Sequence, residues 1–337
     1  MLAMHMADNL LTPPVAMALN VVAVGILAWS ARQTHRRFDP ARVPLMGVLG
    51  AFVFAAQMIN FPVLPGTSGH LGGGLLLALV LGPHAAALVM ASILIVQCLI
   101  FQDGGLLALG ANIINLGLMP CYLGYGVYRL LAGAAPRPGR AYAALFIAAV
   151  AGCVAGAALV PLEVRVSNLL AVPFSEFLLL MIGLHLLIAL GEAFITFAVV
   201  GYLGRVRPQL VASAVGLPAS SGRLGARAVA ASVFVVSLLL AGLISLYASE
   251  WPDALESLTS GGERRSPAVL PNSSPTVQRV EDVHQRLSPL PDYGGIKGWT
   301  SAPGVIGTIV VLIVVWLIGR SLRPAARPGH PHRSAHL

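Results

Sequence analysis

The stretch "PVAMALNVVAVGILAWSA" fills residues 14–31 and is followed at once by the basic stretch "RQTHRR" at residues 32–37. Such an apolar run has about the length that a helix needs to cross the roughly 30 Å hydrocarbon core of a bilayer. Similar runs recur along the chain, in which 57% of residues are hydrophobic and 10% are charged, against about 25% charged residues in an ordinary soluble domain. Barrel strands would be shorter and would alternate in polarity. The sequence therefore predicts an all-α polytopic membrane protein.

The apolar runs predict nine helices. The third is short and glycine-rich, and we expect it to be half-buried or broken. The nine ranges are 13–31, 43–61, 70–82, 84–101, 106–130, 142–163, 174–203, 228–249 and 302–320.

Arginines gather after the first, fifth, seventh and ninth predicted helices. Basic residues favour the cytoplasmic side of a membrane. The pattern predicts that these loops and the C-terminus are cytoplasmic and that the N-terminus is outside. The formal charge of +8 is dispersed over loops, so we expect a lipid bilayer and not a nucleic acid as the partner of this charge.

Composition divides the chain into four parts. Residues 1–205 form a membrane domain of about seven helices, and residues 206–227 form a basic cytoplasmic linker. Residues 228–320 form a two-helix unit whose segment 250–300 lies outside, and residues 321–337 form a basic tail. The outside segment is rich in Ser, Pro and charge and shows little apolar patterning for a core.

Two isolated histidines suggest a metal site. The amine of Met4, if it is terminal, could chelate a cation together with the amide and ring nitrogens of His5. An imidazole from His70 would add a fourth nitrogen, a donor set that suits Ni(II) or Cu(II) and also Co(II). The alternative is that His5 is a disordered terminal residue and that His70 is a loop histidine whose hydrogen bonds are satisfied.

Several polar residues lie at or near membrane depth, where they are costly and usually face a bundle interior or a cavity. His185 and Glu192 lie two helical turns apart, so they share one face. We expect these residues to outline a polar pocket that opens outward, although each could instead form hydrogen bonds between helices. The set is Gln97, Gln102, Asp103, Asn112, Asn115, His185 and Glu192.

The sequence does not predict an enzyme. No G-x-x-x-x-G-K-[ST] motif occurs, and the only lysine is Lys297, so this chain is not expected to bind ATP in a P-loop. No G-x-S-x-G motif occurs either, and Ser68 and His70 are too close in sequence to read as a nucleophile and its base.

Four stretches resemble the cobalt/nickel substrate-binding (S) component of energy-coupling factor (ECF) transporters, the CbiM/NikM type. They cover about residues 4–205 and read "MHMADNLL", "FPVLPGTSGH", "FQDGGLLALGAN" and "HLLIALGE". The stretches "WPDALE" and "SPLPDYGG" resemble the PDGLE-type (CbiN/NikN-like) component, here fused to the C-terminal side.

The resemblance implies a site for transported Co(II) or Ni(II) formed by Met4, His5 and His70, in which the amine of Met4 is a ligand. That amine exists only if translation starts at Met4 and not at Met1, and we expect the start at Met4.

The resemblance also implies partners: a membrane coupling (T) component and cytoplasmic ATPase subunits, in the cytoplasmic membrane of a bacterium. Ala51 and Ala55 form a small-residue face on which a partner helix, or a helix of this chain, could pack. The predicted function is metal capture for an ATP-driven importer. The alternatives are an autonomous secondary metal transporter or channel, which should show more acidic ligands along its helices, and a membrane sensor or scaffold that does not transport.

Overall fold

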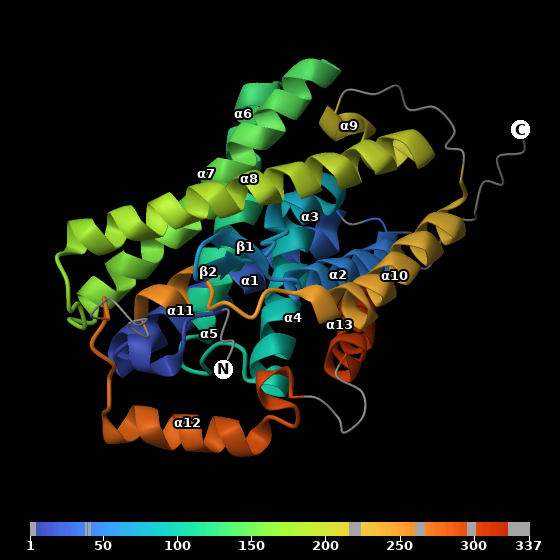
Figure 1. Ribbon diagram of the computed structural model, residues 1–337. Coiled ribbons are helices and arrows are strands. Elements are labelled where there is room, and N and C mark those ends of the chain that lie inside the picture. Colours follow the sequence, from blue (N-terminus) through green and yellow to red (C-terminus); the bar gives the residue numbers. More distant parts are fainter. Residues whose placement is uncertain are drawn as a thin grey trace, which may run out of the picture.

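The computed structural model describes residues 5–37, 39, 42–215, 224–259, 267–294 and 301–322. Helices dominate this part of the chain (Figure 1), which confirms the all-α class. The exception is an antiparallel hairpin in which Phe61 pairs with Gly69 and Pro62 with Ser68. The elements are α1 (Pro13–Arg37), α2 (Val43–Gln57), β1 (Phe61–Leu64), β2 (Thr67–Gly69), α3 (Gly74–Leu81), α4 (Pro83–Phe101), α5 (Leu109–Asn112), a π-helical segment (Ile113–Gly124), α6 (Tyr125–Ala132), α7 (Pro138–Val166), α8 (Phe174–Val206), α9 (Ala212–Val215), α10 (Ala226–Gly242), α11 (Ala254–Thr259), α12 (Pro275–Leu287) and α13 (Ala302–Ser321), with short 3-10 turns at Asp8–Leu10, Pro208–Leu210, Ile244–Tyr247 and Pro291–Tyr293.

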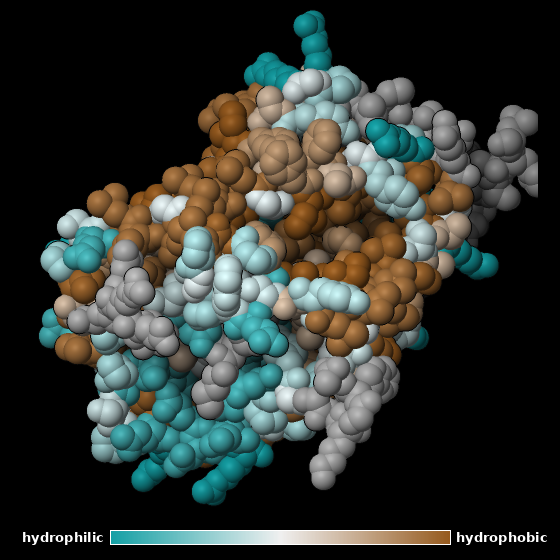
Figure 2. Space-filling view, in the orientation of Figure 1, coloured by the Kyte–Doolittle hydropathy of each residue, from teal (hydrophilic) through white to brown (hydrophobic). Residues whose placement is uncertain are grey.

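Six helical segments of the described chain are long and apolar enough to cross a membrane: Pro13–Arg36, Pro83–Phe101, Pro138–Val166, Phe174–Val206, Ala226–Tyr247 and Ala302–Ser321. Many of their large apolar side chains point outward. Figure 2 shows this surface as a broad brown band, with hydrophilic residues gathered at the end where α12 lies. A lipid environment accommodates such a surface, whereas water does not. The protein is a multi-pass membrane protein.

Three of the nine predicted helices differ from the prediction. The run at 43–61 ends as a helix at Gln57, and the chain then turns into the hairpin. The run at 70–82 is helical only over Gly74–Leu81, because Gly73 has a φ of +81°, a conformation that residues with a Cβ rarely adopt. The run at 106–130 is three helical pieces in succession, and its π-helical piece contains Pro120, which has no N–H to donate.

The two C-terminal membrane helices pack against α2, and close contacts at its glycines allow this. A Cβ on Gly47 would lie 3.1 Å from the carbonyl oxygen of Leu312 in α13. Ala51 and Ala55 are fully buried. These two residues therefore pack against helices of this chain, which was one of the two interpretations, and offer no surface to a partner helix.

The segment predicted to lack a core instead packs onto the bundle, so that expectation is wrong. On α12, Val277 and His284 are buried, and their seven-residue spacing places them on one face. The ring Nε2 of His284 donates to the carbonyl oxygen of Cys98 at 2.8 Å, near the end of α4. On α11, Ala254, Leu255 and Leu258 are buried.

Backbone pairing fixes the same segment. Its N–H groups donate to carbonyl oxygens of the membrane domain, from Ser249 to Asn60 at 2.8 Å, from Leu270 to Leu169 at 2.7 Å and from Leu290 to Ile100 at 3.0 Å. Parts of the predicted linker (residues 216–223) and most of the predicted tail (residues 323–337) lie outside the described residues.

Candidate metal-binding site

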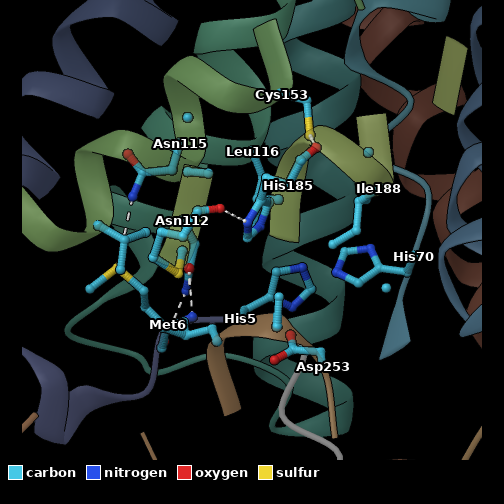
Figure 3. A pocket seen from close by; sticks show the side chains of 18 of the residues that line it. His5, Met6, His70, Asn112, Asn115, Leu116, Cys153, His185, Ile188 and Asp253 are labelled. Carbon is cyan, nitrogen blue, oxygen red and sulfur yellow. Dashed lines mark hydrogen bonds between the residues drawn. The ribbon is translucent and has the colours of Figure 1, made fainter. Parts of the chain in front are cut away.

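A pocket lies where the N-terminal segment, the hairpin loop, the π-helical segment, α7, α8 and α11 meet (Figure 3). The imidazoles of His5 and His70 border it together with polar side chains from four other elements. The polar and sulfur-bearing residues that line it are His5, Met6, His70, Asn112, Asn115, Cys153, Met181, His185, Glu192 and Asp253.

His5 and His70 are brought together from distant parts of the sequence. Their ring centroids are 5.7 Å apart, and the rings meet edge to face at 61°. Both are buried, with 3% of His5 and 9% of His70 exposed. Met4, the third predicted ligand, lies outside the described residues. The structure thus contradicts the alternative in which His5 is a terminal residue without a fixed place.

Asp103 holds the ring of His5. The Nδ1 atom of His5 lies 2.8 Å from Oδ1 of Asp103, and both side chains are almost fully buried. Burial alone would lower the pKa of His5, but the adjacent Asp103 carboxylate outweighs it, and the net pKa is raised. Burial would likewise raise the pKa of Asp103, and the facing His5 lowers it overall. The Nε2 atom of His5 has no hydrogen-bond partner among the described residues.

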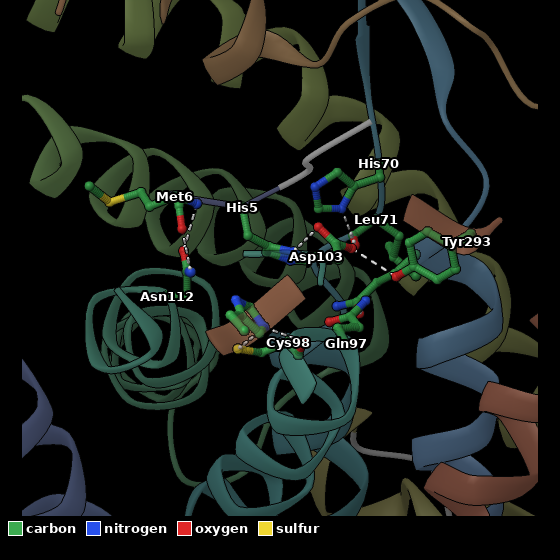
Figure 4. Close-up of polar contacts among 11 residues, drawn as sticks. His5, Met6, His70, Leu71, Gln97, Cys98, Asp103, Asn112 and Tyr293 are labelled. Carbon is green, nitrogen blue, oxygen red and sulfur yellow. Dashed lines mark hydrogen bonds and ion pairs between the residues drawn. The ribbon is translucent and has the colours of Figure 1, made fainter. Parts of the chain in front are cut away.

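Hydrogen bonds hold the backbone around His5 in place. The N–H of Met6 donates to Oδ1 of Asn112 at 2.9 Å, and Nδ2 of Asn112 returns a bond to the carbonyl oxygen of Met6 at 3.0 Å (Figure 4). The carboxylate of Asp8 accepts the N–H groups of Leu107 and Ala108. These contacts fix the position from which His5 enters the pocket.

The glycine pair of "FQDGG" makes room for this segment. Gly104 has a φ of +87°, and a Cβ there would lie 2.9 Å from Cβ of His5 and 2.8 Å from Nδ2 of Asn112. The N–H of Gly105 donates to the carbonyl oxygen of Met6 at 2.8 Å. The two glycines therefore leave the space in which the N-terminal segment packs.

The loop that carries His70 is fixed by the interior of the bundle. Oε1 of Glu192 accepts the N–H of Gly73 at 3.0 Å, and Nε2 of Gln57 donates to the carbonyl oxygen of Gly72 at 2.8 Å. Gln57 in turn accepts a bond from Nε2 of Gln97 at 3.0 Å. Two of the predicted polar residues, Gln97 and Glu192, thus act on the backbone beside His70.

The tautomer of His70 follows from its own hydrogen bond. Nδ1 of His70 lies 3.1 Å from the carbonyl oxygen of Leu71. A carbonyl only accepts, so Nδ1 carries the proton and the lone pair lies on Nε2. Metal-binding histidines commonly donate their other ring nitrogen to a carbonyl in this way.

Two further predicted residues, Asn115 and His185, form hydrogen bonds with residues outside the predicted set. Nδ2 of Asn115 donates to Oε2 of Glu163 at 2.9 Å. The ring of His185 donates through Nδ1 to the carbonyl oxygen of Met181 at 2.8 Å. His185 and Glu192 both line the pocket, as their shared helix face predicts. Gln97, Gln102 and Asp103 do not line the pocket, and Gln102 adopts a left-handed conformation at the end of α4.

Two residues of the C-terminal unit also belong to the site, and neither is among the residues predicted from the sequence. Asp253, which lines the pocket, is 5% exposed. Burial raises the pKa of its carboxyl group to about 7. Tyr293 donates its O–H to Oδ2 of Asp103 at 2.8 Å, and its ring stacks on Phe101. Both residues stand in the "WPDALE" and "SPLPDYGG" stretches, which were the available signal.

The described side chains alone do not form a complete metal centre. In the ranges that the structure describes, no three His, Cys, Asp or Glu side chains lie close enough together to hold one ion. The arrangement is a pair of oriented imidazoles, each bonded through Nδ1 to an acceptor. It can supply nitrogen donors to a cation but leaves positions for others.

A multi-pass helical bundle that closes around paired imidazoles has the features of a metal-ion transport protein. Comparison with known families agrees. The family described as the cobalt uptake substrate-specific transmembrane region matches residues 5–210, and the PDGLE domain matches residues 227–324. The chain belongs to this cobalt-uptake transmembrane family and carries a PDGLE domain.

One relative is similar over both parts of the chain, and others are similar over the first part only. The chain is 34% identical over 322 residues to a putative fused nickel transport protein NikMN of Archaeoglobus fulgidus, covering 96% of this chain and 100% of the relative. It is 29% identical over 216 residues to a cobalt transport protein CbiM of Desulforamulus reducens, covering 62% of this chain and 84% of the relative. A crystal structure of a truncated transition metal transporter is 32% identical, with a TM-score of 0.53, and covers 59% of this chain and 98% of that one.

Proposed function

We propose that this chain is the substrate-capturing subunit of an ATP-driven, ECF-type importer of Co(II) or Ni(II). It binds the cation on the extracytoplasmic side and delivers it inward with a membrane coupling component and cytoplasmic ATPases. In this orientation the N-terminus is outside, the C-terminus is cytoplasmic, and the segment with α11 and α12 lies at the outer face of the cytoplasmic membrane of a bacterium.

The observation that carries the proposal is the buried pair of His5 and His70, with ring centroids 5.7 Å apart. Burial of two imidazoles side by side is costly unless a ligand or a hydrogen bond uses their nitrogens. Nitrogen donors of this kind suit Co(II) and Ni(II). Both metals appear in the names of the relatives, which are nickel or cobalt transport proteins.

The ring of His5 has two ways to bind the cation. Its Nε2 atom has no hydrogen-bond partner among the described residues, so it can bind while Asp103 keeps hold of Nδ1. A chelate that also uses the amide nitrogen of His5 needs Nδ1, because only Nδ1 closes a six-membered ring. A half-turn about the Cβ–Cγ bond exchanges Nδ1 with Cδ2, so Nδ1 leaves Asp103 and becomes available to the cation.

Equilibrium binding tests the proposal. Purified protein in lipid nanodiscs is titrated with Co(II) and with Ni(II), and His70→Ala is compared with His35→Ala, whose side chain is exposed near the far end of α1. Loss of an outer contact of a metal site costs 10–100-fold in affinity, so loss of His70 as a ligand should cost more than about 100-fold. His35→Ala should bind as the parent does. Unchanged binding by His70→Ala would overturn the proposal.

Transport tests the energy source. Proteoliposomes that contain this chain with the coupling component and the ATPases should accumulate Co(II) or Ni(II) only when ATP is supplied to the ATPases. Uptake by liposomes that contain this chain alone would instead make it an autonomous transporter.

The amine of Met4 is part of the proposal as a further nitrogen donor. Mass spectrometry of the intact protein from its native host should find Met4 as the first residue. Active protein that retains Met1, Leu2 and Ala3 would remove this donor from the site.

A further inference from the structure

The C-terminal unit places a carboxylate in the metal pocket. Asp253 lines the pocket together with His5 and His70, and Figure 3 shows it beside both rings. Its Oδ1 accepts the N–H of Glu256 at 2.6 Å, at the start of α11. This bond sets the orientation of the carboxylate from its own helix.

The backbone around Asp253 is fixed to the loop that carries His70. The N–H of Ser68 donates to the carbonyl oxygen of Pro252 at 2.8 Å, and Oγ of Ser68 donates to the carbonyl oxygen of Trp251 at 2.7 Å. Ser68 and Asp253 form an isolated parallel β-bridge at the edge of the hairpin. The position of Asp253 is therefore coupled to the position of His70, two residues from Ser68.

A cation in this pocket needs negative charge nearby. Imidazole nitrogens are neutral donors, and a divalent charge removed from water is strongly unfavourable unless opposite charge compensates it. Two other carboxylates near the site are engaged with the protein: Asp103 with His5 and Tyr293, and Glu192 with Gly73. Asp253 makes its described side-chain bond through Oδ1 only.

We propose that Asp253 balances the charge of the bound cation from outside its inner ligands, so that the C-terminal unit is part of the metal site. This inference rests on the proposed function. An outer position fits the described residues, in which no three His, Cys, Asp or Glu side chains are close enough to hold an ion directly. A dication in the pocket also favours the ionised form of a neighbouring carboxyl group.

Asp253→Asn is the test variant, because asparagine is as good a helix N-cap as aspartate and keeps an oxygen for the N–H of Glu256. Its Co(II) affinity should fall by about tenfold or more, the range seen when an outer partner of a metal site is lost. The visible absorption spectrum of bound Co(II), which reports the inner donors, should stay that of the parent. An unchanged affinity would overturn the inference, and so would a changed spectrum, which would make Asp253 a direct ligand.

Two further variants separate charge from docking. Ser68→Ala loosens the contact with Trp251 and Pro252 but keeps the charge of Asp253, and it should change Co(II) affinity by no more than about fivefold, the effect expected from one neutral hydrogen bond. Asp282→Asn removes a carboxylate from the exposed side of α12 and should bind as the parent does. A loss in Ser68→Ala as large as that in Asp253→Asn would overturn the inference.

His70→Ala is measured alongside them. If His70→Ala binds Co(II) as the parent does, the proposed function itself fails. If His70→Ala loses binding while Asp253→Asn matches the parent, only the role of Asp253 fails.

Discussion

The backbone N–H of Ser68 donates to the carbonyl oxygen of Pro252 at 2.8 Å, across 184 positions of sequence. Ser68 stands two residues before His70, and Pro252 stands one residue before Asp253. This bond is one of several that join the two parts of the chain, and it lies at the edge of the pocket, so the membrane domain and the PDGLE domain meet where the proposed cation binds.

Ser68→Ala should loosen this joint without unfolding the bundle. It removes the hydroxyl that donates to Trp251 and Pro252, a loss of about 1 kcal/mol. Hydrogen–deuterium exchange should then be about fivefold faster at the amides of β2. Ser257→Ala is the control, because its hydroxyl bonds within α11 to Ala254. Equal exchange in β2 for the parent and Ser68→Ala would contradict the prediction.

Asp103→Asn should weaken metal binding through His5. The carboxylate orients the ring by a bond of 2.8 Å to Nδ1, and loss of such a partner costs 10–100-fold in metal affinity. Titration calorimetry with Co(II) measures the effect. The control is Asp292→Asn, an exposed neighbour of Tyr293 with a φ of +53°, which asparagine adopts readily. Parent-like affinity in Asp103→Asn would show that His5 needs no orienting carboxylate.

Glu192 should act as a positioning residue for His70 and not as a ligand. Glu192→Ala leaves the buried N–H of Gly73 without its acceptor, which costs about 1–3 kcal/mol. It should lower both the unfolding temperature and the Co(II) affinity. Glu192→Gln keeps an amide oxygen for Gly73 and should restore most of both. Failure of the glutamine variant to restore affinity would point to a need for the negative charge.

Gly104→Ala should displace the N-terminal segment. Its φ of +87° is strained for alanine, and the new Cβ would lie within 3 Å of His5 and Asn112. We expect Co(II) affinity to fall by at least about tenfold, the cost of disturbing the surroundings of a metal ligand. Gly126→Ala in α6 is the matched control, since no atom lies within 4 Å of its added Cβ. Equal Co(II) affinities in the two variants would show that Gly104 is not needed to hold the N-terminal segment in place.

Much of the fold could be predicted because membrane helices carry their own signal. The long apolar runs correspond to α1, α4, α7, α8, α10 and α13. The end of α2 at Gln57 and the hairpin after it could not be found in the same way, because no long apolar run marks the stretch "FPVLPGTSG". Its prolines and glycines were the better signal.

Some residues of the candidate site could likewise be predicted from the sequence, and others could not. His5 and His70 could be chosen because each stands isolated beside apolar runs, and the shared face of His185 and Glu192 follows from helical spacing. The contribution of Asp253 could not be derived from spacing, because the bonds that bring it to the pocket are made by the backbone of Pro252 and Trp251. Backbone pairing leaves no side-chain pattern in the sequence.

The placement of α11 beside the pocket has a further consequence, because one polypeptide carries both the imidazoles and the helix that borders them. Docking is then intramolecular, and its strength is set by an effective concentration that does not depend on how much protein the cell makes. Each proposed metal site is therefore paired with one α11, and dilution in the membrane cannot separate the two.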